Sequence, residues 1–203
     1  GCGKSVLSAA AIEDIKRLCF VEKGHTVAYF YFTFSDPKKQ DLRNMLRSII
    51  GQLLLASSDI GLPDEIIKLY RSSKASGMLP DIKDLQVALS HITGLSRKTF
   101  IILDALDEFP KATRGRLLSW IGELRADPDA GSLSLLMTSR PETDIAKSLE
   151  LPTTFAIPLQ SKFIDPDIQS YIESCLDRRP GFTKFTEVMK GEIKERLVSG
   201  SQG

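Results

Sequence analysis

Short apolar runs alternate along this chain with longer segments in which apolar residues recur every three or four positions. The short runs have the β-branched and aromatic content of strands and cover residues 26–34, 99–103, 132–137 and 153–157. The longer segments have the spacing of amphipathic helices and cover residues 5–21, 40–55, 64–71, 82–92, 114–125, 166–176 and 186–198. Strands that alternate with helices predict an α/β fold, in which helices cover both faces of a parallel sheet.

For three of these segments, the sequence also predicts a position in the sheet or the apolar face of a helix. The aromatic run of residues 26–34 is typical of a central strand. In residues 5–21, the predicted apolar face of the helix carries Leu7, Ala11, Ile15 and Leu18. In residues 40–55, a single stripe carries Leu42, Met45, Leu46, Ile49, Ile50, Leu53 and Leu54.

Composition places the chain among ordinary globular proteins. It has 203 residues, of which 42% are hydrophobic and 26% are charged, which suits one α/β domain with a sizeable core. A net charge of +1 gives no electrostatic reason to expect binding to nucleic acid or to an anionic membrane. No apolar run approaches the roughly 18 residues of a membrane span. We therefore expect neither a nucleic-acid partner nor a membrane-spanning segment.

Cysteine and histidine usage points away from metal centres. Cys2, Cys19 and Cys175 are scattered and odd in number, which favours free thiols in a reducing cytoplasm over disulfides or a zinc site. His25 and His91 are isolated, so neither is expected to act as a ligand or a base.

The first five residues, Gly1 to Ser5, match the end of the phosphate-binding pattern G-x-x-x-x-G-K-[ST]. The opening glycine of that pattern would lie three residues before Gly1, so the sequence begins inside the motif and the first strand is expected to be missing. Gly3 lets the backbone approach phosphate oxygens, and the N–H groups at the following helix start point at the anion. Lys4 is expected to reach the β- and γ-phosphates, and Ser5 to bind Mg²⁺. The predicted nucleotide-binding residues are Gly1, Cys2, Gly3, Lys4, Ser5 and Val6.

An apolar strand ends in acidic residues about a hundred positions later. Asp104 closes the strand, and we expect it to bind Mg²⁺ through a water molecule. Many P-loop ATPases place a glutamate directly after such an aspartate, but this position holds Ala105. The predicted base for hydrolysis is therefore Asp107, with Glu108 second. The alternative is that these two acids only solvate a loop or cap the next helix.

Arg140 follows the strand of residues 132–137 and is the third predicted catalytic residue, because it could stabilise charge on the γ-phosphate. Its alternative is an ordinary surface arginine. Ligands of parallel α/β sheets sit outside the carboxyl ends of the strands. Lys4, Ser5, Asp104 and Arg140 each follow a strand, so they are expected to meet in one crevice.

Three stretches together resemble the NACHT domain of STAND-class P-loop NTPases: Lys4–Ser5, Asp104–Phe109 and Leu135–Glu142. The small residue after the first aspartate, with acids two and three positions beyond it, separates NACHT domains from most of their relatives. Further stretches are similar to fungal NLR-like proteins of non-self recognition and heterokaryon incompatibility: Tyr29–Phe32, Asp36–Leu53 and Val198–Gly203.

The resemblance implies a three-layer P-loop NTPase sandwich in residues 1–160, truncated at its start, and the beginning of a C-terminal helical region in residues 161–203. It implies ATP as the nucleotide, with GTP open, and Mg²⁺ as the metal. In such proteins an effector domain precedes this core, ankyrin or WD40 repeats follow it, and nucleotide exchange drives self-association. The winged-helix elements that often carry a nucleotide-sensing histidine are absent from this sequence, so His25 and His91 are not assigned that role.

The leading functional prediction is a nucleotide-operated signalling switch with slow hydrolysis, in a non-self recognition or cell-death receptor. A conventional ATPase or kinase with fast turnover is the alternative, but the sequence has no arginine-rich lid, no L-S-G-G-Q-type signature and no N-K-x-D motif. A third class is an interaction module that has lost nucleotide binding, against which Lys4, Ser5 and Asp104 argue.

Overall fold

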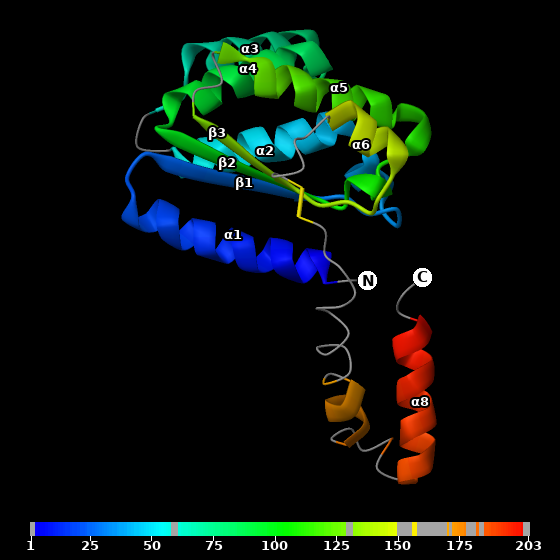
Figure 1. Cartoon of the computed structure of the whole chain (residues 1–203). Coiled ribbons are helices and arrows are strands. Elements are labelled where there is room, and N and C mark those ends of the chain that lie inside the picture. The colour runs from blue at the N-terminus through cyan, green and yellow to red at the C-terminus, as the bar shows by residue number, and fades with distance from the viewer. Residues whose placement is uncertain are drawn as a thin grey trace. The chain divides into compact units, whose positions relative to one another are not determined.

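The computed structural model of this protein, shown in Figure 1, describes residues 3–57, 61–128, 132–149, 156–157, 170, 172–177, 182 and 185–200. The chain divides into two compact units. One spans Ser5–Leu151, and the other combines Gly1–Lys4 with Pro152–Gly203. The domain boundary predicted at residue 160 falls outside the described residues.

The unit of Ser5–Leu151 is built on a parallel sheet of three described strands: β1 (His25–Tyr31), β2 (Lys98–Asp104) and β3 (Leu133–Met137). The strand order is β1-β2-β3. Tyr31 pairs with Asp104 and Leu103 with Met137, so the three strands end at one edge of the sheet. The predicted mixed α/β architecture with a parallel sheet is confirmed.

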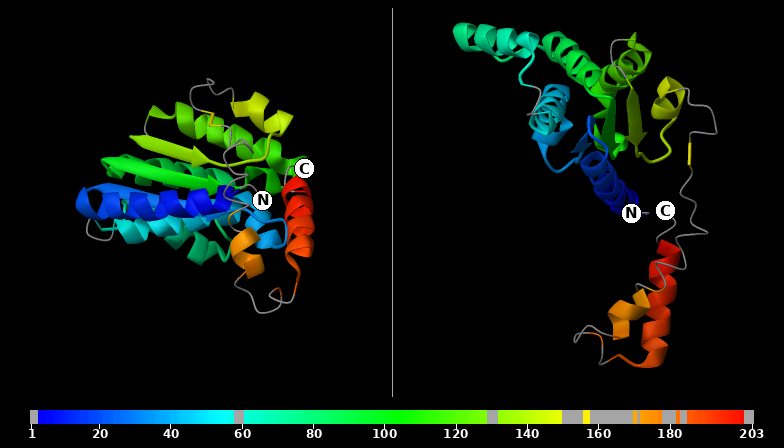
Figure 2. Two further views of the ribbon diagram at one scale, coloured as in Figure 1. Left: turned by 60° about the horizontal axis from the view of Figure 1, so that its bottom comes forward. Right: turned by 90° about the vertical axis from the view of Figure 1, so that its left-hand side faces the viewer.

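Helices cover both faces of this sheet. Helix α1 (Lys4–Val21) lies on one face, and α2 (Leu42–Ala56), α4 (Ile82–Leu95) and α5 (Lys111–Ala126) lie on the other (Figures 1 and 2). Further helical segments of the unit are η1 (Pro37–Gln40), α3 (Asp64–Ser76), the 3₁₀ turn η3 (Leu106–Glu108) and α6 (Thr143–Leu149). In the other unit, α8 spans Glu187–Gly200. The helices predicted at residues 5–21, 40–55, 64–71, 82–92, 114–125 and 186–198 are confirmed, with ends that shift by a few residues.

The hydrophobic core lies between the sheet and α2, α4 and α5. Its fully buried members include Met45, Leu46, Ile49, Leu53, Leu89, Ile92, Ile101, Leu103, Leu117 and Ile121. The stripe predicted on α2 supplies the largest share, because its apolar residues recur every three or four positions. Burying one such side chain stabilises the fold by about 1.5–3 kcal/mol. The side chains of Asp41 and Asp81 cap α2 and α4 by accepting hydrogen bonds from the N–H groups of Asn44 and Asp84.

The buried face of α1 differs from the predicted one. Ser8 and Ile12 are the buried residues of this helix, whereas Leu7 and Leu18 are 48% and 41% exposed. The predicted face is wrong because apolar residues occur all round this helix. Their helical periodicity is weak and therefore does not identify the buried face. The helix instead presents Ser8 to the sheet, where its hydroxyl has a hydrogen-bond partner.

The strand predicted at residues 26–34 is β1, which is shorter than predicted and is not central in the described sheet. Within the described sheet it lies at an edge, and β2 is the middle strand. It ends at Tyr31 because β2, its partner, ends at Asp104. The N–H of Phe32 still donates to the carbonyl of Asp104, and the chain then turns away, which leaves Phe34 77% exposed.

Three further segments are α6 and the elements predicted at residues 153–157 and 166–176. Helix α6 was not predicted, because its seven residues are too few to show a clear period. Of the strand predicted at residues 153–157, residues 153–155 lie outside the described part, and Ala156 and Ile157 are in no strand. Of the helix predicted at residues 166–176, the described residues 170 and 172–176 are helical. No helix in the described ranges is both long and apolar enough to cross a bilayer.

Candidate functional site

The carboxylate of Asp104 is the centre of a buried polar cluster at the carboxyl end of β2. Its side chain accepts hydrogen bonds from three hydroxyl groups. Ser5 Oγ lies 2.7 Å from Oδ2, while Ser8 Oγ and Thr138 Oγ1 lie 2.5 Å and 2.7 Å from Oδ1. Asp104 is 2% exposed, and a buried carboxylate is tolerated only where hydrogen bonds replace its hydration. Three segments far apart in the sequence therefore converge on one charge.

The fold explains this convergence. Ser5 and Ser8 are three residues apart on α1 and share the helix face that meets the sheet. Thr138 directly follows β3, the neighbour of β2. Because the strands are parallel, the residues that follow them meet at one edge of the sheet.

Ser5 and Asp104 are the two residues that the sequence predicts as Mg²⁺ partners, and they are in direct contact across 99 positions of sequence. Hydroxyl and carboxylate oxygens are the ligand types that Mg²⁺ takes in proteins, usually together with water and substrate phosphates. The described residues contain no group of three or more His, Cys, Asp or Glu side chains that could hold a metal without such help. The pair therefore fits a metal that arrives with a phosphate ligand.

Burial at this edge of the sheet also affects Tyr31, the last residue of β1 and the register partner of Asp104. Burial, followed by the negative charge of Asp104, raises the pKa of the Tyr31 phenol above its ordinary value. The Tyr31 phenol therefore keeps its proton beside the Asp104 carboxylate.

The predicted phosphate loop leads into α1. Gly3 has a positive φ of 73°, a left-handed conformation that favours glycine. Apart from its chain neighbours, no described residue has an atom within 4 Å of where a Cβ would be. Lys4 is the first residue of α1, and Val6 is 74% exposed. Gly1 and Cys2, the other predicted nucleotide-binding residues, lie outside the described part of the chain.

The acidic loop, residues 104–109, begins with an unusual backbone conformation. Ala105 has φ 61° and ψ 55°, and it is the only residue other than glycine with a positive φ among the described residues. This left-handed conformation costs an L-residue about 1–2 kcal/mol. Thr138 holds it in place, because Thr138 Oγ1 accepts from the N–H of Ala105 at 2.9 Å and the Thr138 carbonyl accepts from the N–H of Leu106 at 2.9 Å.

Both predicted bases are engaged by neighbouring loops. Asp107 Oδ1 accepts from the backbone N–H of Arg140 at 2.9 Å, and Oδ2 lies 3.4 Å from Arg140 Nε. The side chain of Asp107 is 8% exposed, whereas that of Arg140 is 70% exposed. Glu108 Oε2 accepts from the N–H of Phe34, in the loop after β1, at 3.0 Å. Asp107 and Arg140 are thus brought together, and both carboxylates act as acceptors that brace loops.

Sequence reasoning missed three polar residues around this site: Ser8, Thr138 and Arg114. The spacing of Ser8 from Ser5 and the position of Thr138 after a strand are signals that could have identified them. Arg114 is 4% exposed and contacts the acidic loop. Its signal is a charged residue at a position where α5 otherwise carries buried apolar residues, namely Leu117, Leu118, Ile121 and Leu124.

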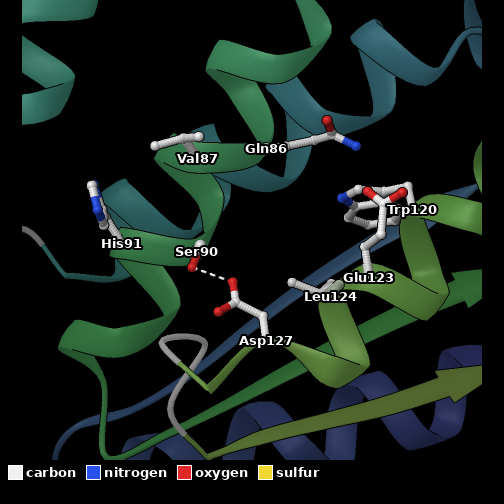
Figure 3. Close-up of a pocket in the computed structure, with 8 residues that line it drawn as sticks. All are labelled: Gln86, Val87, Ser90, His91, Trp120, Glu123, Leu124 and Asp127. Carbon is white, nitrogen blue, oxygen red and sulfur yellow. Dashed lines mark hydrogen bonds between the residues drawn. The ribbon is translucent and has the colours of Figure 1, made fainter.

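A separate hollow of about 380 Å³ opens between α4 and the second half of α5 (Figure 3). Ser90 donates to Asp127 Oδ2 across it at 2.5 Å. The other lining residues are Gln86, Val87, His91, Trp120, Glu123 and Leu124. None of the predicted site residues lines this hollow, so it is not part of the cluster around Asp104.

A family model matches most of this chain. The model described as Nephrocystin 3, N-terminal matches residues 1–140, a range that includes the phosphate loop, the acidic loop and Arg140. This family comprises NACHT-associated N-terminal regions, and the match is not to a NACHT or P-loop model itself. No curated protein and no solved structure matches the chain.

Proposed function

The chain belongs to the Nephrocystin 3, N-terminal family, and from this premise we propose that it is a P-loop nucleotide-binding core of the NACHT type that operates as a signalling switch. The observation that carries the proposal is the contact of Ser5 Oγ with Asp104 Oδ2 at 2.7 Å. The phosphate-loop pattern and the acidic strand end are separate features about a hundred residues apart in the sequence, and no local interaction would bring them together. Their contact at the carboxyl edge of a parallel sheet supports a shared ligand there.

The proposal gives each residue one role. Gly3 and the N–H groups at the start of α1 face the phosphates, and Lys4 neutralises the β- and γ-phosphate charge. Ser5 and Asp104 hold Mg²⁺, which would neutralise charge on the β- and γ-phosphates. Arg140 responds to the presence of the γ-phosphate. ATP is the proposed nucleotide, with GTP as the competitor.

The acidic loop supports slow rather than fast hydrolysis. A general base needs a carboxylate oxygen that can take a proton from the attacking water. The carboxylates of Asp107 and Glu108 accept hydrogen bonds from Arg140 and Phe34 instead. Neighbouring loops thus hold both carboxylates in place, which supports a switch with slow hydrolysis in which the triphosphate persists. Self-association through this core, control by effector and repeat domains of the same chain, and a role in non-self recognition or cell death are parts of the same proposal.

Equilibrium titration of fluorescent ATP into the full-length protein, with and without Mg²⁺, tests nucleotide binding. Lys4→Ala should abolish binding, because the phosphates lose their main point charge. Asp104→Asn should weaken Mg²⁺-dependent binding at least about 10-fold and Mg²⁺-free binding far less, because it removes the carboxylate that would hold Mg²⁺ through a water molecule. Asp14→Asn is the matched control, since Asp14 lies on the same helix as Ser5 with a side chain that is 75% exposed.

Unchanged affinity in Lys4→Ala would overturn the phosphate-loop assignment. An equal loss with and without Mg²⁺ in Asp104→Asn would remove Asp104 from the metal site. Competition between ATP and GTP in the same titration identifies the base. Light scattering with ATP and then with ADP tests the switch, because only a nucleotide-controlled assembly changes its mass between the two states.

A further inference from the structure

We propose that Arg114 is the positioning residue of the acidic loop and sets where Asp107 and Arg140 stand relative to Asp104. The consequence for hydrolysis rests on the proposed function, whereas the consequence for the loop itself does not. The guanidinium lies at the start of α5, and its side chain is 4% exposed. It is the only charged side chain among the six buried residues of that helix.

One side of the guanidinium holds the backbone of the acidic loop. Arg114 Nη2 donates to the carbonyl oxygens of Asp107 at 2.6 Å and Phe109 at 3.0 Å, and Nε donates to Phe109 at 3.2 Å. These two carbonyls flank Glu108. A planar group with several N–H donors in fixed directions can bind both carbonyls at once, which defines the path of the loop.

The other side of the guanidinium binds the segment that follows β3. Arg114 Nη1 lies 3.3 Å and 3.0 Å from the two carboxylate oxygens of Asp144, in the first turn of α6, and 3.9 Å from Glu142 Oε2. Burial raises the pKa of Asp144, but the hydrogen bond and charge of Arg114 outweigh this effect, so the pKa lies below its ordinary value. Asp144 therefore stays charged and holds the guanidinium in its orientation.

These contacts continue as far as Arg140. Arg114 binds the carbonyl of Asp107, and the carboxylate of the same residue binds the N–H and guanidinium of Arg140. The chain of contacts therefore runs from Asp144 through Arg114 and Asp107 to Arg140. Thr138 connects the start of the acidic loop to Asp104, because its hydroxyl binds both the Asp104 carboxylate and the N–H of Ala105.

Stability alone does not explain an arginine at position 114, in the buried face of α5. A cation in a buried apolar stripe is often no more stabilising than a well-packed apolar residue, even when it is paired. An apolar side chain would satisfy the packing of α5 but could not donate to the two carbonyls of the loop. Lysine would retain the charge near Asp144, but its single ammonium lacks the planar fork that binds both carbonyls and the carboxylate together.

The test compares Arg114→Lys, Asp144→Asn and the control Arg116→Lys with the wild type, all in the full-length protein. Arg116 is an exposed arginine two positions further along α5. Asp144→Asn keeps Arg114 and its loop contacts, so it is the milder variant if Arg114→Lys does not fold. Hydrogen exchange is followed at the amides of Ala105, Leu106 and Arg140, each of which donates to a partner within this arrangement.

Arg114→Lys should speed exchange at these three amides by about 10-fold or more, while amides in the middle of β2 stay at the wild-type rate. Single-turnover hydrolysis of bound ATP should fall about 10–100-fold, because a misplacement of about 1 Å is enough for such a loss. Affinity for Mg²⁺-ATP should stay within about threefold, because the phosphate loop is untouched. Asp144→Asn should show the same pattern to a smaller degree, and Arg116→Lys should match the wild type.

Unchanged exchange at the loop amides in both Arg114→Lys and Asp144→Asn would overturn the proposal, whether or not nucleotide binds. A lower melting temperature with wild-type hydrolysis and exchange would give Arg114 a purely structural role and would also overturn it. If the wild-type protein binds no nucleotide, the proposed function fails, and the exchange rates alone then decide the positioning role.

Discussion

Thr138 offers the most direct test of the polar cluster, because its hydroxyl makes two buried hydrogen bonds at once. It donates to Asp104 Oδ1 at 2.7 Å and accepts from the N–H of Ala105 at 2.9 Å. Thr138→Val keeps the shape of the side chain and removes both bonds. A hydrogen bond to a charged group contributes about 1.5–3 kcal/mol and a neutral one about 0.5–1.5 kcal/mol.

The added apolar group of valine offsets about 0.8 kcal/mol of this loss. The expected net loss is therefore about 1–4 kcal/mol in the free energy of unfolding. For a chain of this length, each kcal/mol shifts the melting temperature by about 2–4 °C, so we expect a decrease of roughly 2–16 °C. Ser5 and Ser8 still donate to Asp104 in the variant, which keeps the loss moderate.

Denaturant unfolding monitored by tryptophan fluorescence measures this loss. Trp120 is the single tryptophan of the sequence, lies in α5 and is 3% exposed, so its emission reports on the unit that contains the site. Thr138→Ser is the matched control. It keeps the hydroxyl and loses only a methyl group, a change of about 0.8 kcal/mol. If Thr138→Val were at least as stable as the wild type, the hydroxyl contacts would contribute no more than the added apolar group, and the reasoning would be refuted.

Two further predictions concern the backbone and the pH dependence of stability. Ala105→Gly should stabilise the fold by about 0.5–1 kcal/mol, because glycine adopts the left-handed conformation without strain. The control Ala10→Gly, at an exposed position inside α1, should destabilise the fold by about 1 kcal/mol. The same denaturant assay measures both variants, and an Ala105→Gly variant less stable than the wild type would show that the Ala105 backbone is not strained. The depressed pKa of Asp144 means that its stabilising contribution is present above its ordinary pKa of 3.8 and is lost as the pH falls through the lower pKa of the folded state. The stability difference between wild type and Asp144→Asn should thus be constant near neutral pH and shrink below about pH 4, and a difference that persists in acid would rule out the ion pair as its source.

Most of the architecture could be predicted because it depends on local periodicity. The apolar stripe of α2 recurs every three or four residues and is buried as expected, except that Leu54 is only partly buried. β2 and β3 are short apolar runs whose limits shift by one residue at most. Parallel strands bring the residues that follow them to one edge, so the meeting of Ser5 with Asp104 also follows from the order of elements.

The types and order of these elements, and the residues at the carboxyl edge of the sheet, follow from local sequence patterns. The buried face of α1 depends instead on a long-range contact, because Ser8 gains a hydrogen bond to Asp104 that no apolar periodicity encodes. The tertiary structure also decided the partners of Asp107 and of the buried guanidinium of Arg114, since these contacts join segments about 30 residues apart. A local sequence pattern shows only the spacing of residue types along the chain. The position of a buried charge depends instead on the donors or acceptors, often distant in sequence, that replace its hydrating water.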